Sequence, residues 1–451
     1  MIRVLGATAF TVMVALGGHE RAAHVSSSNA PPPDIAALLT AARGAPALIC
    51  SMAAHNFPNN TWGSWGDAPV TPLSSDAARS FRDESMRRLS DADVALLMDG
   101  LASTDPCVRE LSVRLLGGQE TNKVNDALAS RLTSSDASMR ELAAFGLGLA
   151  DAKTSADALI RALRDGTAGV RANAAWALGR MESGRALAGI VSLFNDSDES
   201  VRLAAVSAAG RMDSTSTAAS LTRVLERDQS PAVRRVAAWA LGNIEARDGA
   251  TALANALAHD ADARVREMSA WALGNMEARN SANALVTALH DGDDRVRETA
   301  AWALGNMEQR SAMDALSSAV QGDASPRVRG TAAWAIGQLD DRGATAPAGL
   351  LKALRDDTPD VRLKAAWAVG QLEDRNAVTA VRDALDKEQD TRVQRALVRA
   401  LVKSGGSSEA SMSKLLESSD PVVREAAVRG LVGRQSMNPW PWPQPRPRPF
   451  P

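Results

Sequence analysis

One segment recurs along most of this chain and constrains its fold more than any other feature. Its clearest copy is VRETAAWALGNMEQ at residues 296–309, and close copies stand at 233–246, 265–278 and 361–374. The first residue of each copy serves below as the landmark residue, and eleven landmarks follow one another 30 to 33 residues apart. They are Val108, Met139, Val170, Val201, Val233, Val265, Val296, Val328, Val361, Val393 and Val423. A period of this length is the signature of a repeat architecture.

Each copy carries the start signal of a helix. The residue three positions before the landmark is always Asp, Ser or Thr, whose side-chain oxygen can accept a hydrogen bond from the free N–H groups of a first helical turn. These residues are Asp105, Asp136, Thr167, Asp198, Ser230, Asp262, Asp293, Ser325, Thr358, Asp390 and Asp420. Proline follows in five copies, where its missing N–H costs nothing. The pattern therefore predicts a helix that begins just before every landmark.

The apolar residues predict a second helix in each repeat. Val296, Ala300, Ala303, Leu304 and Met307 form one stripe on a helix with about 100° per residue. A shorter apolar run, such as residues 282–289, precedes each landmark, so we expect two antiparallel helices per repeat. The first nine copies carry Gly nine residues after the landmark, which favours close approach of neighbouring helices. Stacked repeats bury stripes that a single pair leaves exposed.

The pattern Asp-x-x-Val-Arg-x-x-Ala-Ala-Trp-Ala-Leu-Gly-x-Met resembles the HEAT-like repeats of the phycobilin-lyase type, over residues 91–434. The resemblance implies an all-α fold, an armadillo-like α-solenoid of about eleven two-helix repeats. It further implies one helix layer on the concave side and one on the convex side. It does not imply one activity, because such repeats occur in enzymes and in scaffolds.

The segments outside the array differ in composition. Residues 1–18 resemble a secretory signal, with Arg3 before an apolar run and a small-x-small site at Ala15-Leu16-Gly17. We expect an exported, periplasmic or cell-envelope protein; an uncleaved membrane anchor or a cytoplasmic location are the alternatives. Residues 19–33 form a linker, residues 34–90 an N-terminal cap region with a Trp/Gly loop, and residues 435–451 a proline-rich tail. The tail is either a recognition peptide that offers Trp440, Trp442, Arg446 and Arg448, or a disordered tail.

Composition limits the partners. The net charge is −2, whereas a dedicated nucleic-acid binder usually carries a basic stripe, so we expect no nucleic acid. Two cysteines, Cys50 and Cys107, exclude a disulfide-rich scaffold and a cysteine zinc site. If the protein is exported, the two could bridge the cap region to the first repeat. Otherwise they are two inert thiols.

A regular series of tryptophans is the candidate binding site. The tryptophan ladder consists of Trp239, Trp271, Trp302, Trp334 and Trp367, each six residues after its landmark and outside the apolar stripe. If the second helix lines the concave side, five indoles stand along the groove as rigid contact surfaces. The alternative is that each indole lies over the small residues of an adjacent repeat and only holds the repeats together.

No residues form a recognisable catalytic or metal site. His19-Glu20 and His24 have i, i+5 spacing, whereas a zincin helix needs i, i+4. His259 and His290 occupy equivalent places in neighbouring repeats without a third ligand. Deoxyhypusine hydroxylase is built from similar repeats and requires His-Glu pairs, but the matching places here read Arg266-Glu267 and Arg297-Glu298. We therefore expect no enzyme activity, no metal and no cofactor.

The sequence thus predicts a non-catalytic scaffold that binds a protein or a peptide. The alternative is a lyase-like or chaperone-like subunit that acts on a bound cofactor or pigment. Membrane contact is expected only through an uncleaved N-terminal segment, and the oligomeric state stays open.

Overall fold

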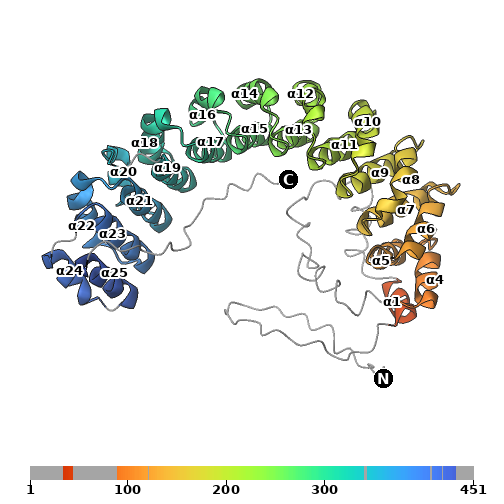
Figure 1. Cartoon of the computed structure of the whole chain (residues 1–451), viewed down its shortest axis with the longest axis horizontal. Coiled ribbons are helices and arrows are strands. Elements are labelled where there is room, and N and C mark those ends of the chain that lie inside the picture. Colours follow the sequence, from red (N-terminus) through yellow and green to blue (C-terminus); the bar gives the residue numbers. More distant parts are fainter. Residues whose placement is uncertain are drawn as a thin grey trace.

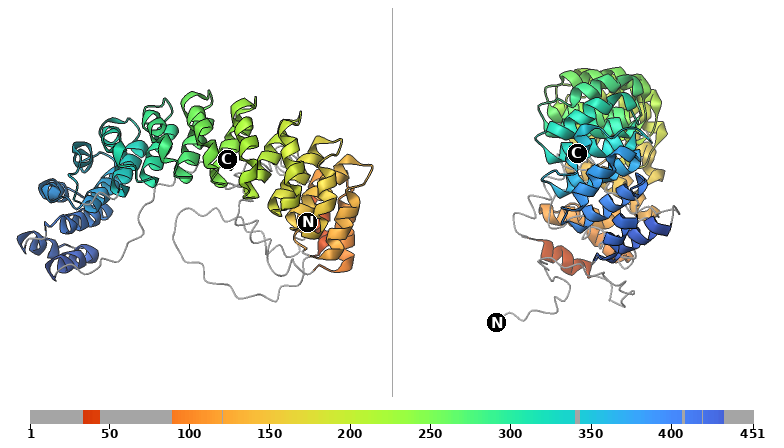
Figure 2. Two further views of the ribbon diagram at one scale, coloured as in Figure 1. Left: turned by 45° about the horizontal axis from the view of Figure 1, so that its top comes forward. Right: turned by 90° about the vertical axis from the view of Figure 1, so that its left-hand side faces the viewer.

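The chain folds into an arch of stacked helix pairs. The computed structural model describes residues 34–43, 89–119, 121–339, 343–406, 409–418 and 420–432, and every regular element in these ranges is a helix. From α4 to α25 the helices form eleven pairs, with the first helix of each pair on the outer, convex side and the second on the inner, concave side (Figure 1). Two further views show one continuous array (Figure 2). The predicted all-α solenoid of about eleven repeats is confirmed.

The inner layer contains the helices that carry the landmarks. They are α5 (Pro106–Gly117), α7 (Ala137–Leu149), α9 (Ala168–Arg180), α11 (Glu199–Arg211), α13 (Pro231–Asn243), α15 (Ala263–Asn275), α17 (Asp294–Asn306), α19 (Pro326–Gln338), α21 (Pro359–Leu372), α23 (Thr391–Lys403) and α25 (Pro421–Val432).

The outer layer contains shorter helices. They are α4 (Asp91–Gly100), α6 (Asn122–Arg131), α8 (Ala156–Ala162), α10 (Leu187–Ser192), α12 (Ala218–Arg227), α14 (Ala250–His259), α16 (Ala282–Ala288), α18 (Met313–Gly322), α20 (Ala348–Ala353), α22 (Val378–Leu385) and α24 (Glu409–Leu416). Short 3₁₀ turns precede seven of them: η2 (Lys153–Ser155), η3 (Gly184–Ala186), η5 (Thr215–Thr217), η6 (Arg247–Gly249), η7 (Arg279–Ser281), η8 (Arg310–Ala312) and η9 (Arg375–Ala377). One more, η4 (Leu193–Asn195), follows α10.

Every inner helix begins directly after its expected cap residue. In eight of the eleven helices the cap side chain accepts a hydrogen bond from a backbone N–H of the first turn. Thr167, Ser325 and Thr358 make no such bond. Thr167 instead contacts the guanidinium of Arg140, and Ser325 pairs with Asp294. In these two helices, contacts between repeats therefore take the place of the local cap.

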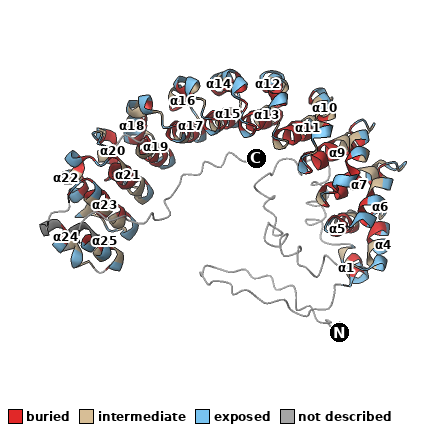
Figure 3. Ribbon diagram, in the orientation of Figure 1, coloured by how far each residue is buried: buried red, intermediate tan, exposed pale blue. Residues whose placement is uncertain are grey.

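The core lies between the two layers. All five residues of the predicted stripe on α17, from Val296 to Met307, are fully buried. Figure 3 shows buried residues along the inner layer and exposed residues on the outer helices. The apolar stripes of neighbouring repeats form one large cluster that extends from α1 to α25, beside a small second cluster of Val398 and Val423. Each repeat is therefore stabilised mainly by its neighbours.

The repeated glycine is explained by the spacing of the inner helices. A β-carbon at Gly305 of α17 would lie 2.7 Å from the Cα of Ala335 in α19, far inside van der Waals contact. The same approach recurs at Gly179, Gly210, Gly242 and Gly274. These glycines allow backbone-to-side-chain contact between repeats, which compensates for their low helix propensity.

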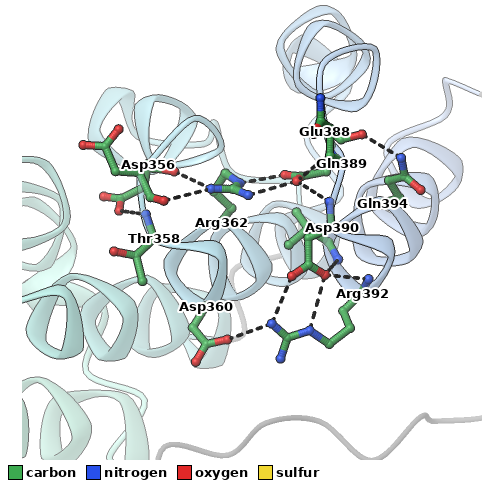
Figure 4. Close-up of polar contacts among 11 residues, drawn as sticks. Asp356, Thr358, Asp360, Arg362, Glu388, Gln389, Asp390, Arg392 and Gln394 are labelled. Carbon is green, nitrogen blue, oxygen red and sulfur yellow. Dashed lines mark hydrogen bonds and ion pairs between the residues drawn. The ribbon is translucent and has the colours of Figure 1, made fainter.

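An ion pair joins most successive repeats on the side of the turns. At the eight landmarks from Met139 to Val361, the Arg after the landmark donates two hydrogen bonds to an acidic residue 25 to 27 positions later. Arg362 with Glu388 is the example in Figure 4. The same guanidinium also donates to a carbonyl of its own turn, as Arg362 does to Asp356 at 2.8 Å. The acidic partner lies two residues before the next cap, as Glu388 lies before Asp390. The regular Arg is therefore a connector between repeats.

A left-handed residue ends most inner helices. Asp151, Glu182, Asp213, Glu245, Glu277, Glu308 and Glu373 all have φ between 45° and 53°. The next N–H closes the helix end, as in Ala246 N donating to Leu241 O at 3.0 Å. Glycine is the usual residue at this position, because a positive φ is strained for a residue with a side chain. The acidic residues therefore adopt a strained backbone conformation at these helix ends.

Helix α1 (Ile35–Ala42) covers the first repeat. Asp34 caps it, and Ile35 and Leu39 are buried against α4 and α5. Cys107 is disulfide-bonded, so it is not an inert thiol; the other cysteine of the sequence, Cys50, lies outside the described residues. So do residues 1–18, the loop with Trp62 and Trp65, and the proline-rich tail. Of the helices described, none is long and apolar enough to cross a membrane.

Candidate binding surface on the concave face

The concave face exposes one stripe of each inner helix. On α15 the accessible residues are Arg264, Glu267, Trp271 and Asn275, three or four positions apart, whereas most of the other residues of the helix are buried. On α17 the same stripe is Arg295, Glu298, Trp302 and Asn306. Residues at these spacings share one helix face. Stacking the repeats turns the stripes into four rows that run along the arch.

The tryptophan row lies against the neighbouring repeat. Trp239, Trp334 and Trp367 are 4–8% exposed, whereas Trp271 and Trp302 are half-buried. Each indole places its Cζ3 edge where the β-carbon of the preceding repeat's glycine would be, as Trp334 does at Gly305. The indoles therefore fill the space that the glycines leave. The binding role of the ladder stays a prediction, and its accessible part is the surface of Trp271 and Trp302.

The asparagine row also connects repeats, and sequence reasoning missed it. The side-chain amides of Asn243, Asn275 and Asn306 donate to the carbonyls of Gly210, Gly242 and Gly274 in the preceding repeat, at 3.0, 3.1 and 3.1 Å. These carbonyls belong to last helical turns, and those of Gly242 and Gly274 also accept from the backbone N–H of Glu245 and Glu277, at 3.2 Å each. The signal was present as Asn directly after Gly in the repeated WALGN. The three asparagines are exposed, and each amide nitrogen has a second N–H beyond this bond.

The arginine row is exposed, like the asparagine row. Arg264 and Arg295 are exposed, and no ion pair or side-chain hydrogen bond holds their guanidinium groups among the described residues. Arg327 is the next member, and it differs because it pairs with Asp294 at 2.8 Å and lies 3.8 Å from Glu298. Two neighbouring guanidinium groups, each with five N–H donors, are thus available at the centre of the arch.

Glu267 is the least expected residue on this face. It is half-buried, and within the described chain no hydrogen bond or ion pair reaches its carboxylate. Burial is the main reason that its pKa is raised to about 7, with Asp293 and Glu298 acting in the same direction and Arg295 and Arg235 against it. A shallow depression of about 460 Å³ opens here, lined by Asp262, Ala263, Arg264, Glu267, Asp293 and Arg295. Such perturbed groups often mark functional sites.

Other charged side chains continue this row. The pKa of Glu298 is also raised, chiefly by burial, although Arg327 and Lys364 lie nearby and oppose the shift. Arg235 on α13 has its pKa lowered by burial, and its Nε has no hydrogen-bond partner. Lys364 of α21 extends over Gly330, where a β-carbon would lie 3.3 Å from its Nζ. The centre of the concave face therefore holds partly desolvated charges of both signs.

The charged side chains of this set are carboxylates, guanidinium groups and one ammonium group. Across the described part of the chain, no group of three or more His, Cys, Asp or Glu side chains is arranged to hold a metal ion. Glu267 and Glu298 occupy the places that were compared with the iron site of deoxyhypusine hydroxylase, next to Arg266 and Arg297. Those two arginines are engaged with Asp291 and Asp323 between repeats.

Comparison with known proteins agrees with the helical pairs. A family model of HEAT repeats matches residues 125–208, 156–229, 187–274, 218–297, 282–348 and 347–432, which together span 125–432. No curated protein matches the chain. A structure of Kap95p binding RanGDP contains a chain that is 15% identical, with a TM-score of 0.54, over 75% of this chain and 57% of that one.

Two further solved structures are similar, with lower TM-scores. An engineered protein is 22% identical, with a TM-score of 0.41, over 75% of this chain and 98% of its own. The complex of CpcE and CpcF of phycocyanin lyase from Nostoc sp. PCC7120 is 24% identical, with a TM-score of 0.34, over 55% of this chain and 93% of that chain. At such identities, likeness to a solved structure concerns the fold and not the ligand.

Proposed function

Because this chain belongs to the HEAT repeat proteins, we propose that it is a non-catalytic scaffold whose concave face binds a protein or a peptide. The observation that carries the proposal is the group of charges around the central depression that make no ion pair or side-chain hydrogen bond within the described chain. Arg264 and Arg295 offer exposed donors, and Glu267 offers a half-buried carboxylate, within one open surface. A half-buried polar group without a hydrogen-bond partner, such as Glu267, is costly alone and gains when a ligand pairs it.

The construction of the array supports the same proposal. Between neighbouring inner helices, a bidentate ion pair, an indole on a glycine and an asparagine on a carbonyl fix the relative position of the repeats. A surface held in this way needs little reordering on binding, and such preorganisation raises affinity. The half-buried Trp271 and Trp302 add apolar contact area beside the charges.

The location that we propose is outside the cytoplasm. Cys107 is disulfide-bonded, and disulfides persist mainly in oxidising compartments such as the periplasm. The signal-like residues 1–18 point the same way, although they lie outside the described residues. The partner would then be a protein of the cell envelope or an exported peptide.

Affinity capture with matched variants tests the proposal. The bait is the wild-type chain beside Arg264→Glu/Arg295→Glu, which reverses two exposed charges without touching the packed rows. The control is Arg247→Glu/Arg279→Glu, which makes the same change at exposed residues of η6 and η7, away from the concave face. We expect one partner to be retained by the wild type and the control and lost by the groove variant.

The alternative assignment rests on the repeat motif, which resembles that of phycobilin lyases. A lyase-like or chaperone-like subunit would carry a bound pigment or cofactor. Visible absorbance that co-purifies with the folded protein, together with equal partner lists from all three baits, would favour this alternative over the scaffold.

A further inference from the structure

The central concave face is rich in hydrogen-bond donors. Arg264 and Arg295 present guanidinium N–H groups, and Asn275 and Asn306 each keep one amide N–H beyond the bond to a glycine carbonyl. Glu267 and Glu298 lie between these donor rows. A matching ligand has many backbone acceptors, few backbone donors, and cationic side chains for the two carboxylates.

A segment of this chain has that chemistry. Residues 438–451 read NPWPWPQPRPRPFP, in which every second residue is proline, so half of its backbone positions lack an N–H while all carry a carbonyl. Residues 433–451 contain three arginines and no acidic residue. Proline-rich segments are prepared for binding because the polyproline II conformation costs little entropy, and they characteristically dock on aromatic-lined grooves. Trp271 and Trp302 supply the aromatic surface here.

The length of the segment brings its arginines to the two carboxylates. The described chain ends at Val432 on α25, an inner helix, and Arg446 and Arg448 follow 14 and 16 residues later (446 − 432 and 448 − 432). At about 3.1 Å per residue in polyproline II, they reach roughly 43 and 50 Å from that point. Packed helices are about 8–10 Å apart, so α17 and α15, four and five inner helices back, lie at roughly 32–50 Å.

We propose that residues 438–451 dock along the concave face of their own chain, with Arg446 and Arg448 at the carboxylates of Glu298 and Glu267. The tail then occupies the binding surface until a partner displaces it. Tethering gives it an effective concentration in the millimolar range, so a weak contact is sufficient. This inference rests on the proposed function only because the tail and the proposed partner use the same surface.

Photocrosslinking in the full chain tests the docking. Phe450 is replaced by p-benzoylphenylalanine, the monomer is irradiated, and the crosslinked residues are mapped by mass spectrometry. We expect crosslinks concentrated on the exposed stripes of α13, α15 and α17. In Glu267→Gln/Glu298→Gln they fall at least fivefold, whereas Glu226→Gln, at an exposed carboxylate of outer helix α12, leaves them unchanged. Circular dichroism verifies that all variants keep their helix content.

Two outcomes overturn the docking. One is crosslinks spread over the outer layer or formed between two molecules; the other is an unchanged yield in the double variant. The result is separable from the capture experiment. If the full chain gives no crosslinks on the concave face but captures a partner that depends on Arg264 and Arg295, the docked tail is refuted and the scaffold function stands. If the expected crosslinks form but no partner is captured, the docked tail stands and the result counts against the scaffold function.

Discussion

Trp334 lies with its Cζ3 where a side chain on Gly305 would begin, 2.9 Å from the position of a β-carbon on that glycine. One residue belongs to α19 and the other to α17, so the pair joins two repeats. The same relationship joins Trp271 to Gly242 and Trp302 to Gly274. The tryptophan and the glycine of the repeat are therefore one feature, in which the indole of each repeat needs the missing side chain of the repeat before it.

The first prediction concerns this contact. Gly305→Ala places a methyl group 2.7 Å from the Cα of Ala335, so the helices must separate, at a cost of about 1–3 kcal/mol. Gly322→Ala is the control, because a β-carbon there meets nothing within 4 Å, and alanine should stabilise the helix by up to about 1 kcal/mol. Urea unfolding measures both. Equal midpoints for the two variants would show that the close approach is unimportant.

The second prediction concerns the ion pairs between repeats. Arg140 donates to both carboxylate oxygens of Asp165, at 2.7 and 2.9 Å, and both side chains are less than a fifth exposed. These hydrogen bonds are the main reason that the pKa of Asp165 is lowered below its ordinary value of 3.8. Arg140→Gln should destabilise the fold by about 1–2 kcal/mol at neutral pH.

The lowered pKa of Asp165 determines how the stabilisation by this ion pair changes with pH. The stabilisation is present above the ordinary value of 3.8 and is lost as the pH falls through the lower folded value. The difference between wild type and Arg140→Gln should therefore shrink as unfolding is measured from pH 5 to pH 2. A difference that stays constant across this range would contradict the paired-carboxylate account. Arg161→Gln, at an exposed arginine of α8, is the matched control.

The third prediction concerns Glu267. Its pKa is raised to about 7 from an ordinary 4.5, so the folded state favours the neutral acid. In a chain without residues 438–451, where no tail arginine can pair with this carboxylate, stability should therefore decrease as the pH rises from 4.5 to 7. In that same chain, Glu267→Gln removes this dependence and should increase stability at pH 8 by on the order of 1 kcal/mol, after allowance for partial solvent screening. Thermal unfolding at pH 5 and pH 8 measures it, with Glu226→Gln as control. A variant less stable than wild type at pH 8 would mean that the carboxylate is paired in solution.

The fourth prediction concerns Cys107. Because this residue is disulfide-bonded and the sequence has one other cysteine, the native protein should show no reactive thiol before reduction. Mass spectrometry after alkylation, with and without reduction, should differ by two labelled cysteines. Reduction should lower the unfolding temperature of the first repeats, since a crosslink restricts the unfolded chain. Two thiols that label fully without reduction would disprove the bond.

Much of the fold could be predicted from the sequence because the same helix pattern occurs in it eleven times. The cap residues and the apolar stripe of α17 follow from local helix geometry, and the recurring glycine indicates close packing of neighbouring repeats; each is found in the expected place. The left-handed Glu308 could not be predicted, because glycine is the residue that normally signals this conformation. The pairing of Arg297 with Asp323 depends on the stacking distance between repeats, which sequence spacing does not contain.

The candidate site was predicted only in part. The tryptophan row was located by its spacing, but spacing does not show that Trp334 is covered and Trp302 half-covered. Glu267 was noticed only as a residue that failed to match an iron site. Its importance comes from burial without a partner, and this depends on what the neighbouring helices place around it.

Direct titration of the isolated partner tests the central claim. Affinity would be measured by calorimetry for the wild type, for Arg264→Glu/Arg295→Glu and for the control Arg247→Glu/Arg279→Glu. If the concave face is the binding surface, the groove variant should bind at least tenfold more weakly, and the control should match the wild type. Equal affinity for all three proteins would contradict binding at this face.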